Sequence, residues 1–335
     1  MTPALRRALR AVLASEPFRP APLLANPHLQ TIAPALFRRV AAPPLRVEDL
    51  RLPDGDTVRL HHLAGLRGAP RAVLLHGLEG SVESHYAKGL LRQAARRGWH
   101  ATLLEFRSCG GSPMPGAPRL YHSGETGDLA AVLAELRRRE PDRRLVAVGV
   151  SMGGNVLAKL LGESGSDTPL AAAVAYSAPI DLTACGPALD RSLRGVYTRR
   201  FLESLVPKAL AKAAELPHLL DADSIRGARS IVELDDRATA PLHGFADVWD
   251  YYHRSSSLRV LRGVRRPLLL LNAQDDPLIP GASLPWAPES RSRWVLPHFP
   301  RQGGHVGFVS AAPPGRWRLW GEGAAFRFLA AALAL

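Results

Sequence analysis

Short apolar runs alternate with segments of helical periodicity through the first half of the chain. The apolar runs occupy residues 72–75, 101–106, 145–150 and 170–176. Helices are predicted between these runs at 85–97, 124–139 and 155–161, because their apolar residues recur at the 3.6-residue period. Strands that alternate with helices indicate right-handed crossovers and a mostly parallel sheet covered on both faces. The expected class is therefore α/β, with a doubly wound sheet.

The residues that precede this alternation of strands and helices have a different pattern of apolar and polar positions. Residues 1–25 are typical of a short amphipathic helix followed by a proline-rich connector, and residues 26–31 are typical of a compact turn. For His28, within that turn, a capping or packing role is favoured over a functional one. Residues 45–63 alternate as two strands joined by an Asp-Gly turn, which predicts a β-hairpin. The alternation slips by one residue at Glu48-Asp49, which is compatible with a bulge or a strand break there.

The alternation breaks at residues 181–265, which contain helical pieces at 198–206 and 209–215 but no apolar strand. It resumes with strands at 267–271 and 292–296, and the chain closes with a helix at 323–335. We interpret 181–265 as a cap inserted over the carboxyl ends of the strands. The predicted organisation is an N-terminal helix and connector (1–25), a core (26–180 and 266–335) and this cap.

One stretch carries the strongest chemical signal. The run Leu145–Val150 ends in Gly149-Val150-Ser151-Met152-Gly153, and a helical pattern follows at once. A serine on such a strand-to-helix turn projects its hydroxyl from the end of the sheet, and the glycines allow the close backbone approach. This arrangement resembles the nucleophile elbow of the α/β-hydrolases. Ser151 is therefore predicted to be a nucleophile.

A serine nucleophile needs a base, and the base needs an acid to hold it. In this fold the acid follows the serine and the histidine comes last. The turn after the strand at 267–271 offers both Asp275 and Asp276, and we favour Asp276 because Pro277 fixes the chain behind it. Asp275 remains the alternative, with loop capping as its structural role. For the base, the glycine-flanked His305 is favoured over His298, which ends a strand.

An oxyanion hole requires two backbone N–H donors. Met152, the residue after the nucleophile, supplies the first. Leu78 is predicted to supply the second, from the loop His76-Gly77-Leu78 after the strand at 72–75. We expect His76 to hold this loop rather than to act as a catalytic base.

Composition narrows the function classes. The chain has 335 residues, 46% hydrophobic and 22% charged, with a formal net charge of +13. Arginine supplies nearly all the positive charge, since lysine occurs only at Lys88, Lys159, Lys208 and Lys212. We interpret the arginine runs as solvated surface and expect no nucleic-acid partner.

Other site and compartment signals are weak. Cys109 and Cys185 form no disulfide framework. The N-terminus lacks a convincing secretory signal, and no apolar run of about 18–20 residues predicts a membrane span. We therefore expect a cytoplasmic protein without integral membrane association. No histidine or cysteine spacing fits zinc, and Cys109-Gly110-Gly111-Ser112 lacks the lysine of a phosphate loop, so no metal or cofactor is expected.

A series of motifs in order along the chain resembles the YheT-like α/β-hydrolases, subfamily 4 of the AB-hydrolases. These motifs are residues 26–31, 76–81, 149–155, Asp235 with Thr239-Ala240-Pro241, Tyr251-Tyr252, 275–277 and 303–308. The resemblance covers residues 22–330 and implies a charge relay of Ser151, Asp276 and His305. The separation of 29 residues between Asp276 and His305 fits it and supports Asp276. Arg107-Ser108-Cys109-Gly110 departs from the family's more frequent Arg-Gly-Cys, which affects the shape of that loop.

The resemblance implies a serine esterase, a carboxylic-ester hydrolase acting on a small-molecule acyl ester. An acyltransferase or acyl-binding protein using the same pocket is the alternative, because acyl transfer would use the same residues. The natural substrate, its acyl-chain length and the oligomeric state do not follow from the sequence.

Overall fold

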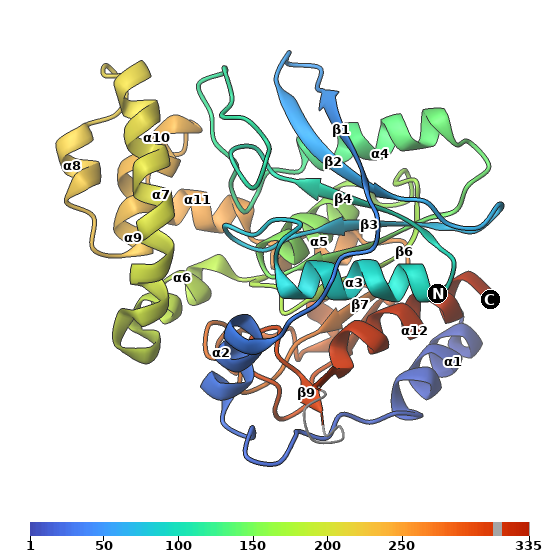
Figure 1. The fold of residues 1–335 in the computed structure, drawn as a ribbon. Coiled ribbons are helices and arrows are strands. Elements are labelled where there is room, and N and C mark those ends of the chain that lie inside the picture. The colour runs from blue at the N-terminus through green and yellow to red at the C-terminus, as the bar shows by residue number, and fades with distance from the viewer. Residues whose placement is uncertain (311–316, 335) are drawn as a thin grey trace.

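A computed structural model describes residues 1–310 and 317–334. Its centre is an eight-stranded sheet in the order β1-β2-β4-β3-β5-β6-β7-β8 (Figure 1). The strands are β1 Arg46–Arg51, β2 Thr57–Leu63, β3 Arg71–Leu75, β4 His100–Glu105, β5 Leu145–Val150, β6 Leu170–Tyr176, β7 Leu268–Leu271 and β8 Val295–His298. Strands β3 to β8 run parallel, and only β1 and β2 are antiparallel to their neighbours. The predicted α/β class is confirmed.

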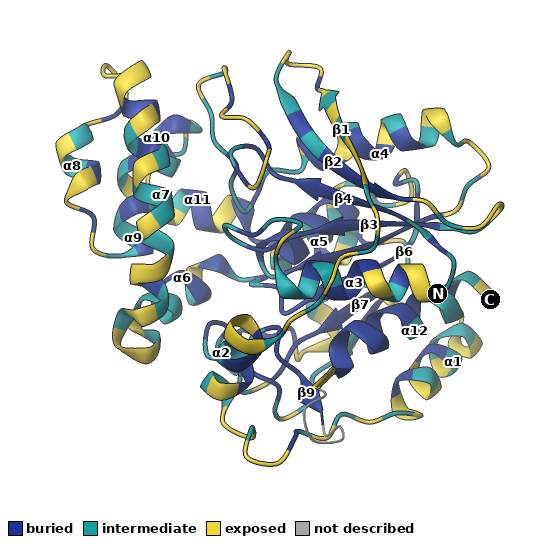
Figure 2. Cartoon of the chain, in the orientation of Figure 1, coloured by how far each residue is buried: buried dark blue, intermediate teal, exposed yellow. Residues whose placement is uncertain are grey.

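Helices cover both faces of this sheet. The helices of this core are α1 Pro3–Ala14, α2 Pro27–Phe37, α3 His85–Arg96, α4 Gly127–Arg139, α5 Met152–Ser164 and α12 Trp320–Ala334. Successive side chains of a strand point to opposite faces of the sheet. Leu74 therefore packs with α1, α3 and α12, whereas Val73 packs with α4 and α5. The central strands are dark blue in Figure 2, since their residues are buried on both sides. Such burial explains why these strands appear as continuous apolar runs.

Two local predictions near the N-terminus are wrong. Residues 26–31 are not a turn, because Asn26 caps helix α2 through hydrogen bonds from the amides of His28 and Leu29, with Pro27 as its first residue. Asparagine before proline is a strong helix-start signal. The hairpin of β1 and β2 forms as predicted, but with neither a bulge nor a strand break at Glu48-Asp49, since the register from Arg46 to Arg51 is unbroken.

Residues 181–265, all of which the structure describes, form helical elements. Those of residues 182–255 lie to one side of the sheet, on the left of Figure 1, whereas residues 257–263 pack against α5. The helical elements are α6 Leu182–Arg191, η1 Ser192–Gly195, α7 Val196–Glu215, α8 Ala222–Arg226, α9 Ile231–Leu234, η2 Asp235–Thr239, α10 Ala240–Leu242, α11 Val248–Ser255 and η3 Ser257–Gly263. Helix α7 is continuous where two pieces were predicted. It passes through Pro207, which removes one helical N–H, while Ala209 and Ala213 on the following turns are buried.

The remaining described elements are short. They are η4 Gly281–Ser283, η5 Pro288–Ser290, β9 Val309–Ser310 and β10 Arg318–Leu319. Residue 335, the last of the predicted closing helix, lies outside the described residues. No helix within the described ranges is long and apolar enough to cross a membrane.

The loop that departs from the family pattern is anchored by a buried arginine. The Arg107 guanidinium bonds both oxygens of Asp128 on α4, at 2.7 and 2.8 Å. It also reaches Asp54 at 2.7 Å and Asp56 at 2.6 Å, in the turn between β1 and β2. Its side chain is 2% exposed. Removing one partner of such a buried network is strongly destabilising, so this ion cluster fixes the start of the loop.

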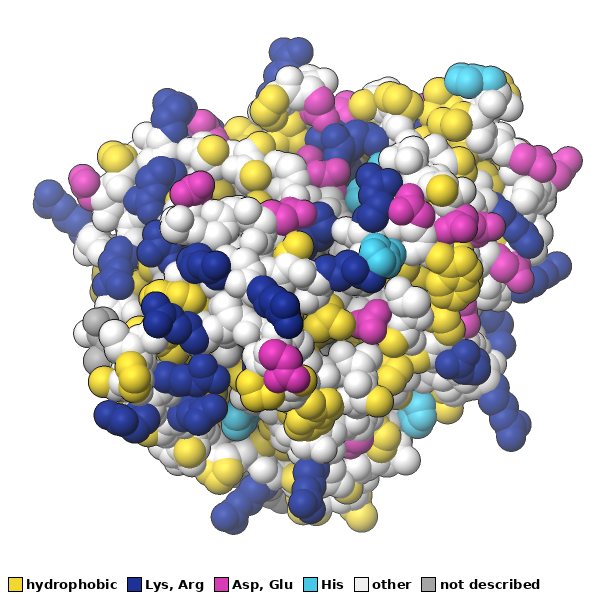
Figure 3. All heavy atoms as spheres, turned by 180° about the vertical axis from the view of Figure 1, so that it is seen from behind, with side chains coloured by type: hydrophobic (Ala, Val, Ile, Leu, Met, Phe, Trp, Pro, Cys, Tyr) yellow, Lys and Arg dark blue, Asp and Glu magenta, His cyan; other side chains and the backbone are white. Residues whose placement is uncertain are grey.

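Basic side chains are spread across the face seen in Figure 3, with acidic side chains among them. Many surface arginines have local partners. Glu135, for example, pairs with both Arg138 and Arg139 on α4, and Arg254 pairs with Asp250 on α11. Exposed pairs of this kind contribute little to stability.

Candidate active site

Ser151 stands on a strained turn between β5 and α5. Its backbone has φ 51° and ψ −123°, a conformation that L-residues rarely adopt. A side chain on Gly149 would place its Cβ 2.2 Å from the carbonyl oxygen of Gly153, and one on Gly153 would place it 2.4 Å from that of His76. Only glycine therefore permits this close crossing of strand and helix.

His305 lies between Ser151 and Asp276. Its Nε2 is 2.9 Å from Ser151 Oγ, and its Nδ1 is 2.9 Å from Asp276 Oδ2. These residues come from three separate loops at the carboxyl ends of the strands. With the proton on Nδ1, the imidazole donates to the carboxylate and accepts from the serine hydroxyl, which is the arrangement a general base needs.

The two neighbouring aspartates point in different directions. Asp276 Oδ1 accepts the amides of Leu278 at 2.9 Å and Ile279 at 3.2 Å, which leaves Oδ2 for His305. Asp275 Oδ1 instead accepts the amide of Gly304 at 3.0 Å. Burial, together with the charge of Asp276, raises the pKa of Asp275. Asp276 therefore has the geometry of the acid, and Asp275 has that of a loop cap.

The loop that holds His305 rests on helix α2. The His305 amide donates to Thr31 Oγ1 at 2.9 Å, and Gln30 accepts the amide of Val309 at 2.6 Å. A side chain on Gly304, where φ is +59°, would place its Cβ 2.5 Å from the carbonyl oxygen of Pro27. The first turns of α2 thus form a platform under the loop. His28 lies beside them, with Nδ1 3.1 Å from the hydroxyl of Tyr197 on α7.

Leu78 and Met152 flank Ser151, and both line the same pocket. A Cβ on Gly77 would lie 3.0 Å from Ser151 Cβ, so this loop runs directly against the serine. Neither the Leu78 amide nor the Met152 amide donates a hydrogen bond to any described residue. The Tyr86 hydroxyl accepts the amide of Gly77 at 2.9 Å and so fixes the loop just before Leu78.

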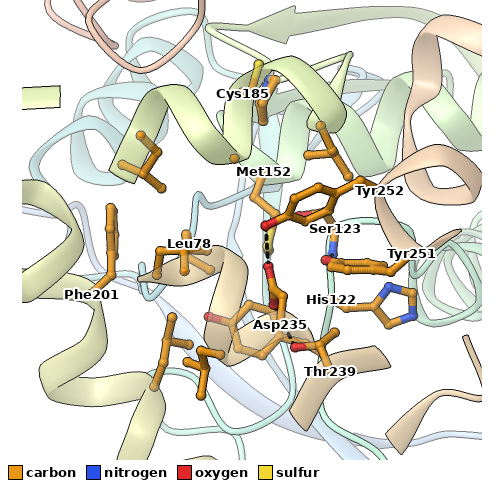
Figure 4. A pocket seen from close by; sticks show the side chains of 18 of the residues that line it. Leu78, His122, Ser123, Met152, Cys185, Phe201, Asp235, Thr239, Tyr251 and Tyr252 are labelled. Atoms are coloured by element: carbon orange, nitrogen blue, oxygen red, sulfur yellow. Dashed lines mark hydrogen bonds between the residues drawn. The ribbon is translucent and has the colours of Figure 1, made fainter. Parts of the chain in front are cut away.

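The pocket above Ser151 and His305 extends among the helices of residues 181–265 (Figure 4). Its walls are mostly apolar, including Leu120, Leu182, Leu189, Phe201, Leu205, Ile231, Leu234 and Ile279. A lining of this kind is typical of sites that bind apolar ligands.

Comparisons with known proteins agree with this architecture. Residues 70–312 match the family model described as the alpha/beta hydrolase fold. YheT of Escherichia coli is 40% identical over 301 residues, which cover 88% of each chain. The chain belongs to the α/β-hydrolase family. Its YheT-like character, inferred from the motifs, is confirmed by this relative.

More distant relatives of this hydrolase have varied names. Embryogenesis-associated protein EMB8 of Picea glauca is 31% identical, over 88% of this chain and 68% of its own length. Phospholipase ABHD3 of Mus musculus is 32% identical, over 73% of this chain and 60% of its own. The esterase Pf2001 of Pyrococcus furiosus shares the fold at a TM-score of 0.57, with 17% identity over 89% of this chain and 98% of that one. The relatives support hydrolase activity.

Sequence reasoning missed an ion pair at the pocket of the hydrolase. Lys208 on α7 bonds both carboxylate oxygens of Glu79, at 2.6 and 2.8 Å, and the Tyr121 hydroxyl donates to Glu79 at 2.5 Å. These hydrogen bonds lower the pKa of Glu79, against the effect of its burial. Glu79 follows Leu78, so the pair ties the loop beside Ser151 to α7. The partners are 129 residues apart, and no local pattern marks them.

His76 has the structural role predicted for it. Its Nε2 accepts the amide of Phe106 at 3.0 Å, so the proton lies on Nδ1, which donates to the carbonyl of Gly77 at 2.7 Å. Burial lowers its pKa to about 4, which keeps the ring neutral near pH 7. Within the described residues no group of three or more His, Cys, Asp or Glu side chains is placed to hold a metal ion.

The buried histidines predict that the hydrolase is sensitive to acid. Burial lowers the pKa of His76, His85 and His243 to about 4, and that of His122 well below its ordinary value. Unfolded histidine titrates near 6.5, so the unfolded chain binds more protons between pH 6.5 and 4. Stability is therefore full above pH 6.5 and falls as the pH drops, by up to about 1.4 kcal/mol per pH unit for each ring.

Urea unfolding at pH 7.5, 6.0 and 5.0 would measure this loss. Carboxyls with a raised pKa, such as that of Asp235 at about 6, oppose the effect. The free energy of unfolding should depend less steeply on pH in His76→Gln than in the parent, by the contribution of about one bound proton. His218→Gln, at an exposed position, should leave this pH dependence unchanged. A free energy of unfolding that stays constant from pH 7 to 5 would contradict the prediction.

Proposed function

We propose that the protein is a carboxylic-ester hydrolase that forms an acyl-enzyme on Ser151. The observation that carries this proposal is the continuous chain of hydrogen bonds from Ser151 through His305 to Asp276, at the base of an apolar pocket. Hydrolase activity of the relatives supports the general reaction, and the pocket favours an ester with an apolar chain.

In the first half of the reaction Ser151 Oγ attacks the ester carbonyl carbon while His305 Nε2 takes the serine proton. Asp276 stabilises the imidazolium that results. The carbonyl oxygen becomes an alkoxide, and the Leu78 and Met152 amides are proposed to bind it, because both are free to donate. The C–O bond to the alcohol then breaks, and His305 gives its proton to the departing oxygen.

In the second half a water molecule attacks the acyl carbon, and His305 Nε2 takes its proton. The second alkoxide collapses, Ser151 Oγ leaves with the proton from His305, and the carboxylic acid is released. We propose that residues 181–265 act as a cap that holds the acyl or alcohol chain during both steps. An alcohol in place of water would make the same residues an acyltransferase.

A fluorophosphonate probe tests the nucleophile directly, since it phosphonylates activated serines. We expect stoichiometric labelling, mapped by mass spectrometry to the peptide that contains Ser151. A panel of p-nitrophenyl esters of graded chain length should then show turnover, and an added alcohol measures how much acyl transfer competes with hydrolysis. Folded protein that binds an ester but is neither labelled nor active would favour an acyl-binding protein instead.

A further inference from the structure

The apolar pocket contains one carboxylate on its cap side. Asp235 lines the pocket and retains partial exposure there. Figure 4 shows its side chain between Tyr252 and Thr239. The Tyr252 hydroxyl donates to Asp235 Oδ2 at 2.9 Å, and the Thr239 hydroxyl donates to Oδ1 at 2.7 Å. The carboxylate is thereby held in one orientation at the wall of the cavity.

The backbone here is unusual. Asp235–Thr239 is a single π-helical turn, inserted between α9 and α10. Such turns are rare, because they add a residue to a helix at the cost of weaker backbone hydrogen bonding. Those that do occur are frequently found at functional sites. In this case the turn brings Asp235 and Thr239 together on the side that faces the pocket.

The charge of Asp235 has no local compensation. No Lys, Arg or His forms an ion pair with it among the residues that the structure describes. Burial, with a further contribution from Asp190, raises its pKa to about 6, against the bonds from Thr239 and Tyr252. Burying an unpaired carboxylate is expensive, and a neutral asparagine could join the same two hydroxyls at lower cost. A purely structural role therefore does not explain the carboxylate.

We propose that Asp235 binds a hydroxyl group on the substrate, so that the preferred substrates are hydroxyl-bearing esters with an apolar chain. This inference rests on the proposed ester hydrolysis. The apolar walls accommodate the chain, and the carboxylate provides one polar anchor within them. A hydroxyl can donate to the ionised form and accept from the protonated form. An ammonium group would lose far more hydration energy on entering the same pocket.

Matched ester pairs test the proposal. One set compares p-nitrophenyl alkanoates with their ω-hydroxy analogues, and a second compares alkyl butyrates with the monobutyrates of the corresponding diols. Graded chain lengths in both sets allow the hydroxyl to reach Asp235 from either side of the ester. We expect kcat/KM to favour the hydroxylated member roughly ten- to a hundredfold at the best length, as for one hydrogen bond to a charged group.

Substitutions separate recognition from structural support. Asp235→Ala should abolish the preference for the hydroxylated member of each pair. Asp235→Asn, which retains the shape of the side chain, should reduce the preference and provides the test if the alanine variant does not fold. Asp223→Ala is the matched control, because Asp223 on α8 is exposed and does not line the pocket, and it should keep the full preference.

The outcomes are distinct. Plain esters hydrolysed without any preference for their hydroxylated partners, or a preference that survives both substitutions of Asp235, would overturn this inference and leave ester hydrolysis standing. A parent protein that hydrolyses no ester of either set would overturn both.

Discussion

Ser151→Ala is expected to lower kcat for a p-nitrophenyl ester by roughly 10⁴- to 10⁶-fold, without loss of the fold. Without Oγ no acyl-enzyme can form, and what remains is water attack assisted by the proposed oxyanion donors. Alanine also removes no packing of consequence, because the serine side chain lies at the open base of the pocket. Steady-state kinetics and far-UV circular dichroism on the purified variant would measure both parts of the prediction.

The matched control is Ser164→Ala, at the other end of helix α5. Ser164 Oγ donates to the carbonyl of Leu160 and does not line the pocket, so kcat should stay close to that of the parent. If Ser151→Ala retained more than about a hundredth of the parental activity, the nucleophile would have to be another group.

Asp276→Asn is expected to lower kcat by about 10⁴-fold. The amides of Leu278 and Ile279 both donate to Oδ1, so an asparagine would place its oxygen there. Its NH2 group would then face His305 Nδ1 and force the imidazole proton onto Nε2. In that tautomer the ring cannot accept the proton of Ser151, and the stabilising charge is also lost.

Asp275→Asn provides a control one residue away. An asparagine oxygen at this position can still accept the amide of Gly304, so the loop before His305 should keep its shape and kcat should change by less than about tenfold. Parallel kinetics of the two variants decide the assignment. A severe loss in Asp275→Asn with near-parental activity in Asp276→Asn would make Asp275 the acid.

The features of the fold that the sequence predicts correctly are those that depend on local patterns. The elbow combines strand, turn glycines and helix within a dozen residues, and the core strands appear as apolar runs because both their faces are buried. The choice between Asp275 and Asp276 depends on which way each side chain leaves the turn. In the structure, the amides of Leu278 and Ile279 donate to Asp276 Oδ1 and so orient that side chain. Residue type alone does not reveal this orientation.

The errors have equally physical causes. The turn predicted at residues 26–31 is wrong because Asn26 before Pro27 is a helix cap, which marks the start of a helix. Separate helical pieces are predicted at 198–206 and 209–215, yet α7 continues through Pro207 between them, because one missing N–H can be tolerated where later turns are packed. The pairing of Lys208 with Glu79 depends on where α7 lies relative to the loop after β3. Such long-range placement leaves no trace in the local sequence.

The platform under the His305 loop has a practical consequence for engineering. Residues 70–312 match the family model, but the contacts from Pro27, Gln30 and Thr31 that support the loop lie well before that range. A truncated or chimeric gene cut at the boundary of the match would keep all three members of the proposed charge relay. It would nevertheless lose α2, which positions the loop that carries the His305 imidazole. Grafting experiments with this hydrolase should therefore treat α2 as an integral part of the catalytic unit.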